Sequence, residues 1–305
     1  MEVLYNQKKA FSVFRRGQIP KRTAPFPMLM GILNISPDSF SDEANGIMDW
    51  TPDNALKRAV RMIEDGADII DIGAVSTRPG APCITPEEEA ARYKKILPLL
   101  VKECTVPLSA DTHRLLPAQV SLDCGVDILN DVSALRIVPE DNAIPHTHWK
   151  DDEEYALLAA REGAAIVLMH ATAIPALRTS LMPAGADIVQ EISDFLVQRA
   201  CYAEQMGIQH EYICLDPGFG FGKNYEDNCH LLRRLPELKE LGYPLLAGLS
   251  RKSLIGDALG FSVHQRLYPS VALAVLSVWQ GGNIIRVHDV FETRSAIDMI
   301  ASICF

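Results

Sequence analysis

The sequence lacks both long apolar runs and an excess of basic residues. Its longest apolar stretches, 164–169 and 271–279, are far shorter than the roughly 18 residues that a membrane-spanning helix needs. The 29 Lys and Arg residues are outnumbered by 39 Asp and Glu residues, so the net charge is −10. Proteins that bind nucleic acid or anionic lipid carry basic patches. We therefore expect no membrane span, no membrane partner and no nucleic-acid partner.

Paired cysteines and a secretory signal are also lacking. The seven cysteines are odd in number, and no two lie within three residues of each other. This pattern is typical of reduced cysteines in a cytoplasmic protein and argues against a disulfide framework or a zinc site. Residues 1–27 are basic but have no apolar signal core. We expect an N-terminal extension there, with a hairpin formed by 3–5 and 11–14; a cleaved transit peptide is the alternative.

From Met28 onward, short aliphatic runs alternate with longer amphipathic ones. Eight runs are strand candidates: 28–35, 68–73, 107–112, 127–132, 164–170, 212–217, 244–250 and 284–290. Helices are expected to begin near Pro52, Pro86, Arg114, Asp152, Asp187, Glu226, Pro269 and Glu292. Glycines suited to helix ends precede most strands: Gly66, Gly125, Gly163, Gly207, Gly242 and Gly281.

This alternation predicts an α/β fold, a (β/α)8 TIM barrel that occupies residues 28–305 as one domain. A doubly wound open sheet is the alternative. The segment 268–280 is apolar nearly all round, which on an outer barrel helix indicates burial on both sides. We expect a homodimer formed through the C-terminal barrel helices, with simple core packing as the alternative.

Polar residues end almost every predicted strand, at the edge where barrel enzymes build their active sites. They are Asn34, Asp71, Asp111, Asn130, His170, Asp216, the run Ser250-Arg251-Lys252, Arg286 and His288. A single Asp at a strand end is often only a helix cap. A whole ring of polar groups would be costly to bury without a ligand. Its acceptors suit a nitrogen heterocycle, and its cations and donors suit phosphate oxygens.

Three other motifs fail as functional signatures. The glycine-rich stretch 218–223 lacks residues that a phosphate-binding P-loop requires, and 248–252 lacks the second glycine of a nucleophile elbow. His146 and His148 lie in a polar connection without a third nearby metal ligand, so we expect a surface loop there.

The polar strand ends lie inside motifs that together resemble the dihydropteroate synthase family. The motifs are 30–42, Ser76-Thr77-Arg78-Pro79-Gly80-Ala81, Asp111-Thr112, 128–131, 168–170, Leu215-Asp216-Pro217-Gly218, Ser250-Arg251-Lys252-Ser253 and Arg286-Val287-His288-Asp289. They run in family order from Met28 to near the C-terminus. The resemblance implies a transferase that joins 6-hydroxymethyl-7,8-dihydropterin diphosphate to p-aminobenzoate and releases diphosphate, assisted by Mg2+.

The resemblance also implies roles for individual residues. The pterin site would comprise Asp71, Asp111, Asn130, Met169, Asp216, Lys252 and Arg286, with Asp71 in either a pterin-binding or a structural role. The diphosphate site would comprise Asn34, Arg286 and His288, with Asn34 near the metal. The p-aminobenzoate site would comprise Phe40, Thr77, Arg78, Pro79, Phe221, Lys252 and Ser253. Asn34, Lys252, Arg286 and His288 would act in catalysis.

The chain departs from the family pattern in three loops. Ala74 and Val75 replace a Gly-Glu pair, 42–44 replaces a common glycine pair, and 171–174 lacks the usual Arg-Gly step. None of these changes falls on the implied pterin residues. Two alternatives remain at this point: a corrinoid methyltransferase with a related pterin-binding barrel, and a pterin-binding paralogue without catalysis.

Overall fold

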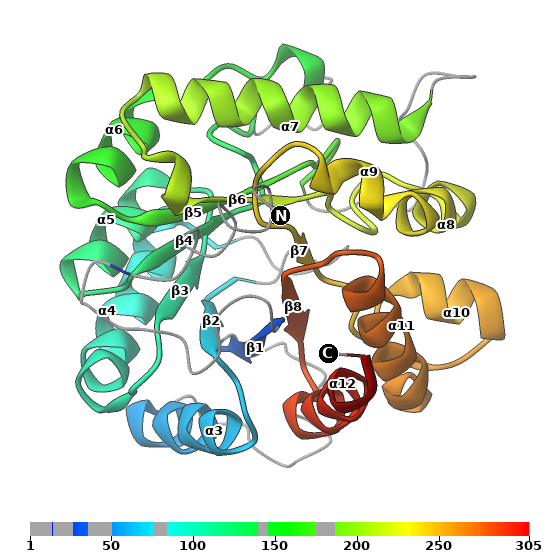
Figure 1. The fold of residues 1–305 in the computed structure, drawn as a ribbon. Coiled ribbons are helices and arrows are strands. Elements are labelled where there is room, and N and C mark those ends of the chain that lie inside the picture. The colour runs from blue at the N-terminus through cyan, green and yellow to red at the C-terminus, as the bar shows by residue number, and fades with distance from the viewer. Residues whose placement is uncertain are drawn as a thin grey trace.

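Eight parallel strands form one sheet that curves into a barrel (Figure 1). The computed structural model describes Phe14 and residues 27–35, 51–75, 84–139, 146–174 and 187–304. The strands are β1 (Met28–Asn34), β2 (Ile69–Gly73), β3 (Leu108–Asp111), β4 (Ile128–Asp131), β5 (Ala165–Met169), β6 (Ile213–Asp216), β7 (Leu246–Ala247) and β8 (Ile284–Val287). Every predicted strand is present, and each lies within its predicted range. The barrel prediction is therefore confirmed.

The seam between β6 and β7 is the weakest junction of the barrel. The hydrogen-bonded order is β6-β5-β4-β3-β2-β1-β8-β7, so the first and last strands must meet to close the sheet. They meet through one parallel bridge between Leu215 and Leu245, in which the Leu215 N–H donates to the Pro244 carbonyl at 2.9 Å. The open doubly wound sheet is thereby excluded, because its edge strands would not pair.

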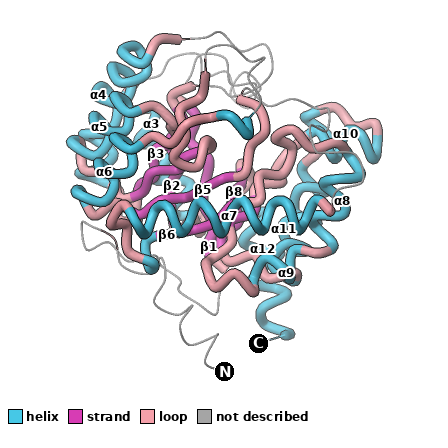
Figure 2. The backbone as a smooth tube through the Cα atoms, turned by 90° about the horizontal axis from the view of Figure 1, so that it is seen from above, coloured by secondary structure: helices cyan, strands magenta, loops and turns pink. Residues whose placement is uncertain are grey.

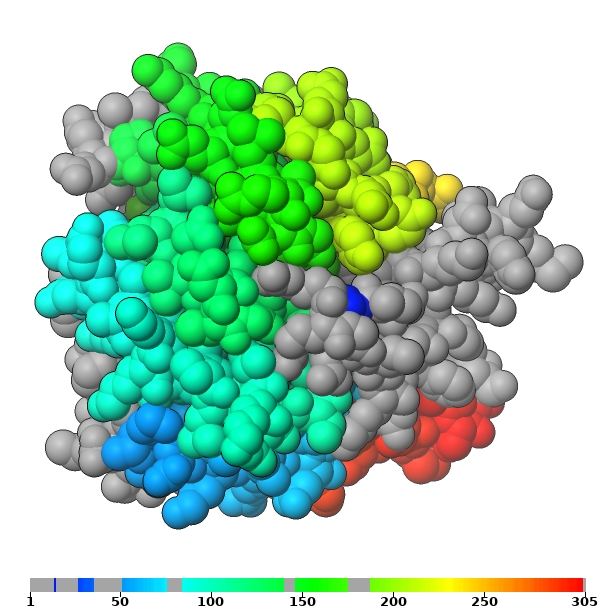
Figure 3. Space-filling view, turned by 90° about the vertical axis from the view of Figure 1, so that its left-hand side faces the viewer, coloured from blue at the N-terminus to red at the C-terminus, as the bar shows by residue number. Residues whose placement is uncertain are grey.

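The helices surround the strands (Figure 1), and Figure 2 shows helices on both flanks and in front of the strands. They are α3 (Pro52–Glu64), α4 (Pro86–Glu103), α5 (Leu115–Asp123), α6 (Glu153–Glu162), α7 (Ile188–Gln205), α8 (Tyr225–Arg233), α9 (Leu235–Lys239), α10 (Ser253–Leu259), α11 (Leu267–Trp279) and α12 (Val290–Cys304). Short 3-10 turns occupy η1 (His146–His148), η2 (His210–Tyr212) and η3 (Val263–Gln265). In Figure 3, α3 to α7 cover one side of the molecule in chain order.

Local sequence signals explain where the helices begin and end. Thr51 caps α3 by accepting from the Asn54 N–H, and Thr85 with Glu88 forms the expected capping box on α4. All six glycines expected at helix ends have positive φ, and Gly163 is itself the left-handed C-cap of α6. The eight predicted helix starts agree with the structure to within two residues, whereas α9 and α10 were not expected.

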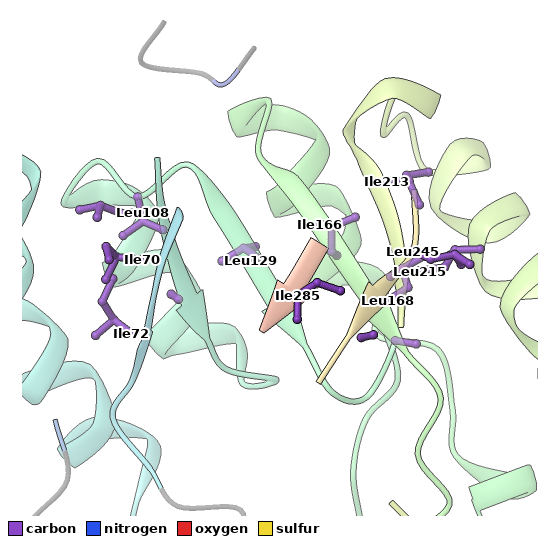
Figure 4. Packing of buried hydrophobic residues seen from close by; sticks show 14 of the residues in the cluster. Ile70, Ile72, Leu108, Leu129, Ile166, Leu168, Ile213, Leu215, Leu245 and Ile285 are labelled. Carbon is purple, nitrogen blue, oxygen red and sulfur yellow. The ribbon is translucent and has the colours of Figure 1, made fainter. Parts of the chain in front are cut away.

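Alternating strand residues divide the barrel core into two parts. Residues of one phase point outward and pack against the helices, among them Ile70, Leu129 and Leu215 (Figure 4). Residues of the other phase fill the barrel interior: Met28, Met30, Ile69, Ile128, Ala165, Val167, Cys214, Leu246 and Ile284. Phe14 packs with this inner cluster at 2% exposure, so part of the N-terminal segment belongs to the barrel core. This alternation is the strand period of two.

Three further predictions from the sequence concern the N-terminal hairpin, membrane-spanning helices and the cysteines. The expected hairpin at 3–5 and 11–14 lies outside the described residues, apart from Phe14. No helix within the described ranges is long and apolar enough to cross a membrane. Cys104, Cys124, Cys201, Cys214 and Cys229 are free thiols, as their spacing predicts.

Candidate active site

The barrel interior becomes polar at the carboxyl ends of the strands. Asn34, Asp71, Asp111, Asn130, Met169, Asp216 and Arg286 continue the phase of the apolar interior residues below them. The parallel register sets Asn34 beside Gly73, Gly73 beside Asp111, and Asp111 beside Asn130. Because these strand ends converge, the sequence-predicted pterin and diphosphate residues of the strands gather at one mouth.

Arg286 links two carboxylates across this mouth. Its Nε donates to Asp71 Oδ2 at 2.7 Å, and its Nη2 donates to Asp111 Oδ2 at 2.7 Å. Asn130 Nδ2 also donates to Asp71 Oδ2, at 3.1 Å. Asp71 is fully buried, and its Oδ1 has no hydrogen-bond partner within the described part of the chain. Of the two roles expected for Asp71, these contacts support the structural one.

Burial and crowding perturb the charges of these groups. Burial is the main cause that raises the pKa of Asp111 to about 7; the Arg286 cation opposes the rise, and the Asp71 charge adds to it. Burial disfavours the charged form of Arg286, but Asp71 and Asp111 raise its pKa, so the guanidinium stays charged. Burial also raises the pKa of Asp216, against the lowering effect of Lys252.

Lys252 reaches the mouth from the N-cap of α10, immediately before Ser253. Its Nζ donates to the Phe219 carbonyl and lies 5.0 Å from the centre of the Phe221 ring. Burial lowers the pKa of Lys252 to about 8, although Asp216 favours the ammonium form. The structure thus brings together Phe221, Lys252 and Ser253, three residues expected at the p-aminobenzoate site.

Ser250, Arg251 and Lys252 are adjacent in the chain, but each contacts a different part of the site. The Ser250 hydroxyl lies 3.0 Å from His288 Nδ1 and accepts from the His288 N–H at 3.2 Å. Arg251 has a φ of 56° and pairs with Asp289 through an Nε to Oδ2 bond of 2.9 Å. Only Lys252 extends toward the loop after β6, so Ser250 and Arg251 support the mouth from behind.

The prediction that His170 lies at the mouth was wrong. His170 was expected among the polar residues of the mouth, but it follows Met169 and so has the outward phase of β5. Its ring packs edge-on against Phe195 of α7, with ring centres 4.9 Å apart. Its Nδ1 lies 2.9 Å from the Nζ of Lys223, a buried lysine at the end of the glycine-rich stretch 218–223, for which the sequence predicted no function.

The altered loops are only partly described. Phe40, Thr77, Arg78 and Pro79, all expected at the p-aminobenzoate site, lie outside the described residues, as do 42–44. The Ala74 carbonyl accepts from Arg92 Nη1 at 2.7 Å, and the Ala171 carbonyl accepts from Arg136 Nη2 at 3.2 Å. Ala171 and Ile174 pack in a small apolar cluster with Met169 and Val132, beside Phe221.

Known proteins are similar to this chain in both sequence and fold. A family model described as "Pterin binding enzyme" matches residues 30–288. Dihydropteroate synthase of Neisseria meningitidis serogroup C is 41% identical over 274 residues, which cover 89% of this chain and 90% of that protein. The chain belongs to the dihydropteroate synthase family.

Solved structures of dihydropteroate synthases support the same conclusion. The Xanthomonas albilineans enzyme with 4-aminobenzoic acid has a TM-score of 0.80 and 37% identity, covering 96% of this chain and 98% of that one. The same organism's enzyme in complex with 7,8-dihydropteroate has a TM-score of 0.76 and 35% identity, covering 94% and 97%. These similarities favour the synthase interpretation over the corrinoid methyltransferase alternative.

The ion pairs of Arg286 with Asp71 and Asp111 predict how the pKa of Asp111 responds to substitutions. Asp71→Asn removes the neighbouring negative charge, so the pKa of Asp111 should fall by about one pH unit. Arg286→Met removes the cation that opposes burial, so the same pKa should rise. Carbon NMR titration of selectively labelled aspartate measures both changes. Shifts of the same sign in the two variants would contradict the shared ion pair.

Proposed function

We propose that this protein is a dihydropteroate synthase, which condenses 6-hydroxymethyl-7,8-dihydropterin diphosphate with p-aminobenzoate to give 7,8-dihydropteroate and diphosphate. The observation that carries the proposal is the Arg286 guanidinium held by Asp71 and Asp111 at the barrel mouth. One cation among several acceptors suits a heterocycle that carries a diphosphate. Family membership indicates the same chemistry.

The pterin ring would bind to the acceptors at the ends of β3, β4 and β6. Asp111 and Asp216 would accept from ring N–H and exocyclic amine groups, while Asn130 both donates and accepts. Met169 is 4% exposed on the inner face of β5, where its thioether would contact the ring face. Lys252 and Arg286 would complete this subsite, and Asp71 would orient Asn130 and Arg286 from below.

The diphosphate would bind at the ends of β1 and β8. Arg286 and His288 supply donors there, and His288 is oriented by the Ser250 hydroxyl at 3.0 Å. Developing charge on the departing oxygens is stabilised by donors that are already in place. Because the diphosphate can leave with this stabilisation, the reaction requires no activated protein nucleophile.

The donor chemistry of the mouth fits a magnesium ion held largely by substrate. No cluster of three His, Cys, Asp or Glu side chains within the described residues could hold a metal. Mg2+ typically binds through one or two side chains, water and substrate phosphates. Asn34 offers an amide oxygen, while Asp71 and Asp111 are engaged by Arg286. Asn34 would therefore hold Mg2+, which would neutralise charge on the diphosphate.

The aryl amine would bind beside the loop after β6. Phe221, Lys252 and Ser253 would contact p-aminobenzoate there, and Phe40, Thr77, Arg78 and Pro79 would complete the subsite from the first two loops. The bond between the pterin methylene and the diphosphate oxygen breaks, and the amine nitrogen forms the new C–N bond and releases a proton. Closure of the two loops would exclude water that competes for the methylene cation.

The chain outside the site also has a proposed organisation. We propose that residues 28–305 form one barrel domain, preceded by the extension 1–27, in a cytoplasmic homodimer. The dimer proposal is supported by six exposed apolar side chains on α11 and α12: Tyr268, Leu276, Trp279, Phe291, Met299 and Ile303. Such a group of exposed apolar residues on two packed helices is typical of a subunit interface.

Activity and its pH dependence test the proposed reaction. The purified protein, given dihydropterin diphosphate, p-aminobenzoate and Mg2+, should form dihydropteroate. Because the carboxylate form of Asp111 is the hydrogen-bond acceptor, kcat/KM for the pterin substrate should fall as the pH drops below about 7. Asp111→Asn should reduce kcat/KM by about a hundredfold through loss of a charge-assisted hydrogen bond.

Asp123→Asn, on the exposed surface of α5, is the matched control and should leave kcat/KM unchanged. Tight pterin binding without product would instead support the non-catalytic paralogue. A pH profile that is flat between 5 and 8 in an active wild-type protein would contradict the role given to Asp111.

The dimer proposal predicts an effect of charge on α11. Trp279, which is 66% exposed, should lie in the subunit interface, so Trp279→Glu should convert dimer to monomer in sedimentation equilibrium. Leu157→Glu, at a 48% exposed position on α6, is the control and should leave the dimer intact. A monomeric wild-type protein, or a dimeric Trp279 variant, would contradict this interface.

A further inference from the structure

The loop that connects β6 to α8 is wound tightly against the chain that follows β5. Gly218, Gly220 and Gly222 have φ values of 67°, 82° and 68°. A Cβ at Gly218 would lie 2.0 Å from the His170 carbonyl oxygen, and one at Gly222 would lie 1.5 Å from Thr172 Oγ1. Only glycine permits both the backbone conformation and the close approach.

Lys223 ties this loop to the end of β5 from inside the protein. Its side chain is 2% exposed. Its Nζ donates to the carbonyls of Gly218 at 2.9 Å, His170 at 3.2 Å and Phe221 at 3.3 Å, and it lies 2.9 Å from His170 Nδ1. None of these four acceptors is a carboxylate. Burial lowers the pKa of Lys223 to about 7, although the Asp216 charge favours the ammonium form, and either form donates hydrogen bonds to these acceptors.

His170 is prepared to receive this hydrogen bond. Burial, together with the charge of Lys223, holds the pKa of His170 well below its usual range. The neutral imidazole therefore has a lone pair on one ring nitrogen, and Nδ1 is the nitrogen that faces Lys223. The outward turn of His170, which removes it from the mouth, supplies the anchor for the loop.

The same loop positions Lys252 on its opposite side. The Phe219 carbonyl accepts from Lys252 Nζ, and the Phe221 ring centre lies 5.0 Å from that atom. A Cβ at Gly220 would lie 3.4 Å from Lys252 Cδ, so the loop backbone packs directly along the lysine stem. The loop carbonyls thus accept from two lysines: those of Gly218 and Phe221 accept from Lys223, and that of Phe219 accepts from Lys252.

We propose that Lys223 is a positioning residue for the reaction: by anchoring the loop to His170, it sets the place of the Phe219 carbonyl and the Phe221 ring, and thereby directs the Lys252 ammonium toward p-aminobenzoate. This inference rests on the proposed function for the substrate that Lys252 contacts. The link from Lys223 to Lys252 is a property of the loop and can be tested separately.

Steady-state kinetics of Lys223→Met tests the proposal. The KM for p-aminobenzoate should rise about tenfold, because a small displacement of a binding group is costly. The KM for the pterin substrate should rise less, since Asp111, Asn130 and Arg286 would contact the pterin from strands that the loop does not hold, and only Lys252 and Asp216 depend on the loop. Lys223→Arg, which keeps a cation able to reach carbonyls, should restore part of the loss. Lys102→Met, at an exposed position near the end of α4, is the control and should match the wild type.

Competitive acetylation of Lys252, followed by mass spectrometry across a pH series, reports the loop without reference to the reaction. Loosening of the loop should hydrate Lys252, so its pKa should rise from its lowered value in Lys223→Met. If wild-type protein forms no dihydropteroate, the proposed function fails, and this measurement alone decides the link between the lysines.

Two outcomes would overturn the proposal. One is an unchanged KM for p-aminobenzoate together with unchanged Lys252 labelling. The other is an equal rise in both KM values with a lowered Tm, which indicates general loss of structure. Should Lys223→Met fail to fold, His170→Phe removes the ring acceptor and keeps an aromatic ring against Phe195; it should shift the p-aminobenzoate KM in the same direction by a smaller factor, and no shift would count against the proposal.

Discussion

The shared ion pair of Arg286 is the interaction on which the rest of the mouth depends. Arg286 comes from β8, while its partners Asp71 and Asp111 come from β2 and β3, so the guanidinium bridges over β1. Two carboxylates in such a buried place would repel each other and lose hydration. One cation between them offsets this cost. Asn34 ends β1, which lies between β8 and the two strands that supply the carboxylates.

A single geometric rule separates the part of the barrel that stabilises the fold from the part that binds ligand. On β1, β2, β4, β6 and β8, inward residues are apolar at the bottom and polar at the top, as with Ile69 and Asp71 on β2 or Cys214 and Asp216 on β6. Outward residues are mainly apolar and pack against the helices, with buried Asp131 at the end of β4 as an exception. The polar groups are thereby fixed by a packed scaffold, which suits binding sites that must not reorganise during reaction.

Much of this architecture follows from the sequence. The strands and the main helices are marked by runs of apolar residues, caps and glycines, and the polar strand ends mark the mouth. The sequence-based predictions were wrong or incomplete in two respects: the direction in which the His170 side chain points, and the contacts between residues far apart in the chain. Counting by two along β5 from Val167 would have turned His170 outward, but the partners of Lys223 and Arg251 lie on other segments of the chain. The short α9 and α10 have too few turns for a clear periodic pattern.

We expect Asp71 to act on the reaction through Arg286, whose guanidinium it holds. A double-mutant cycle of Asp71→Asn and Arg286→Met, measured on kcat/KM for dihydropteroate formation, tests it most directly. If Asp71 acts through Arg286, kcat/KM of the double variant should be little lower than that of Arg286→Met, with a coupling energy of at least about 1 kcal/mol. Additive effects, within about 0.5 kcal/mol, would contradict it.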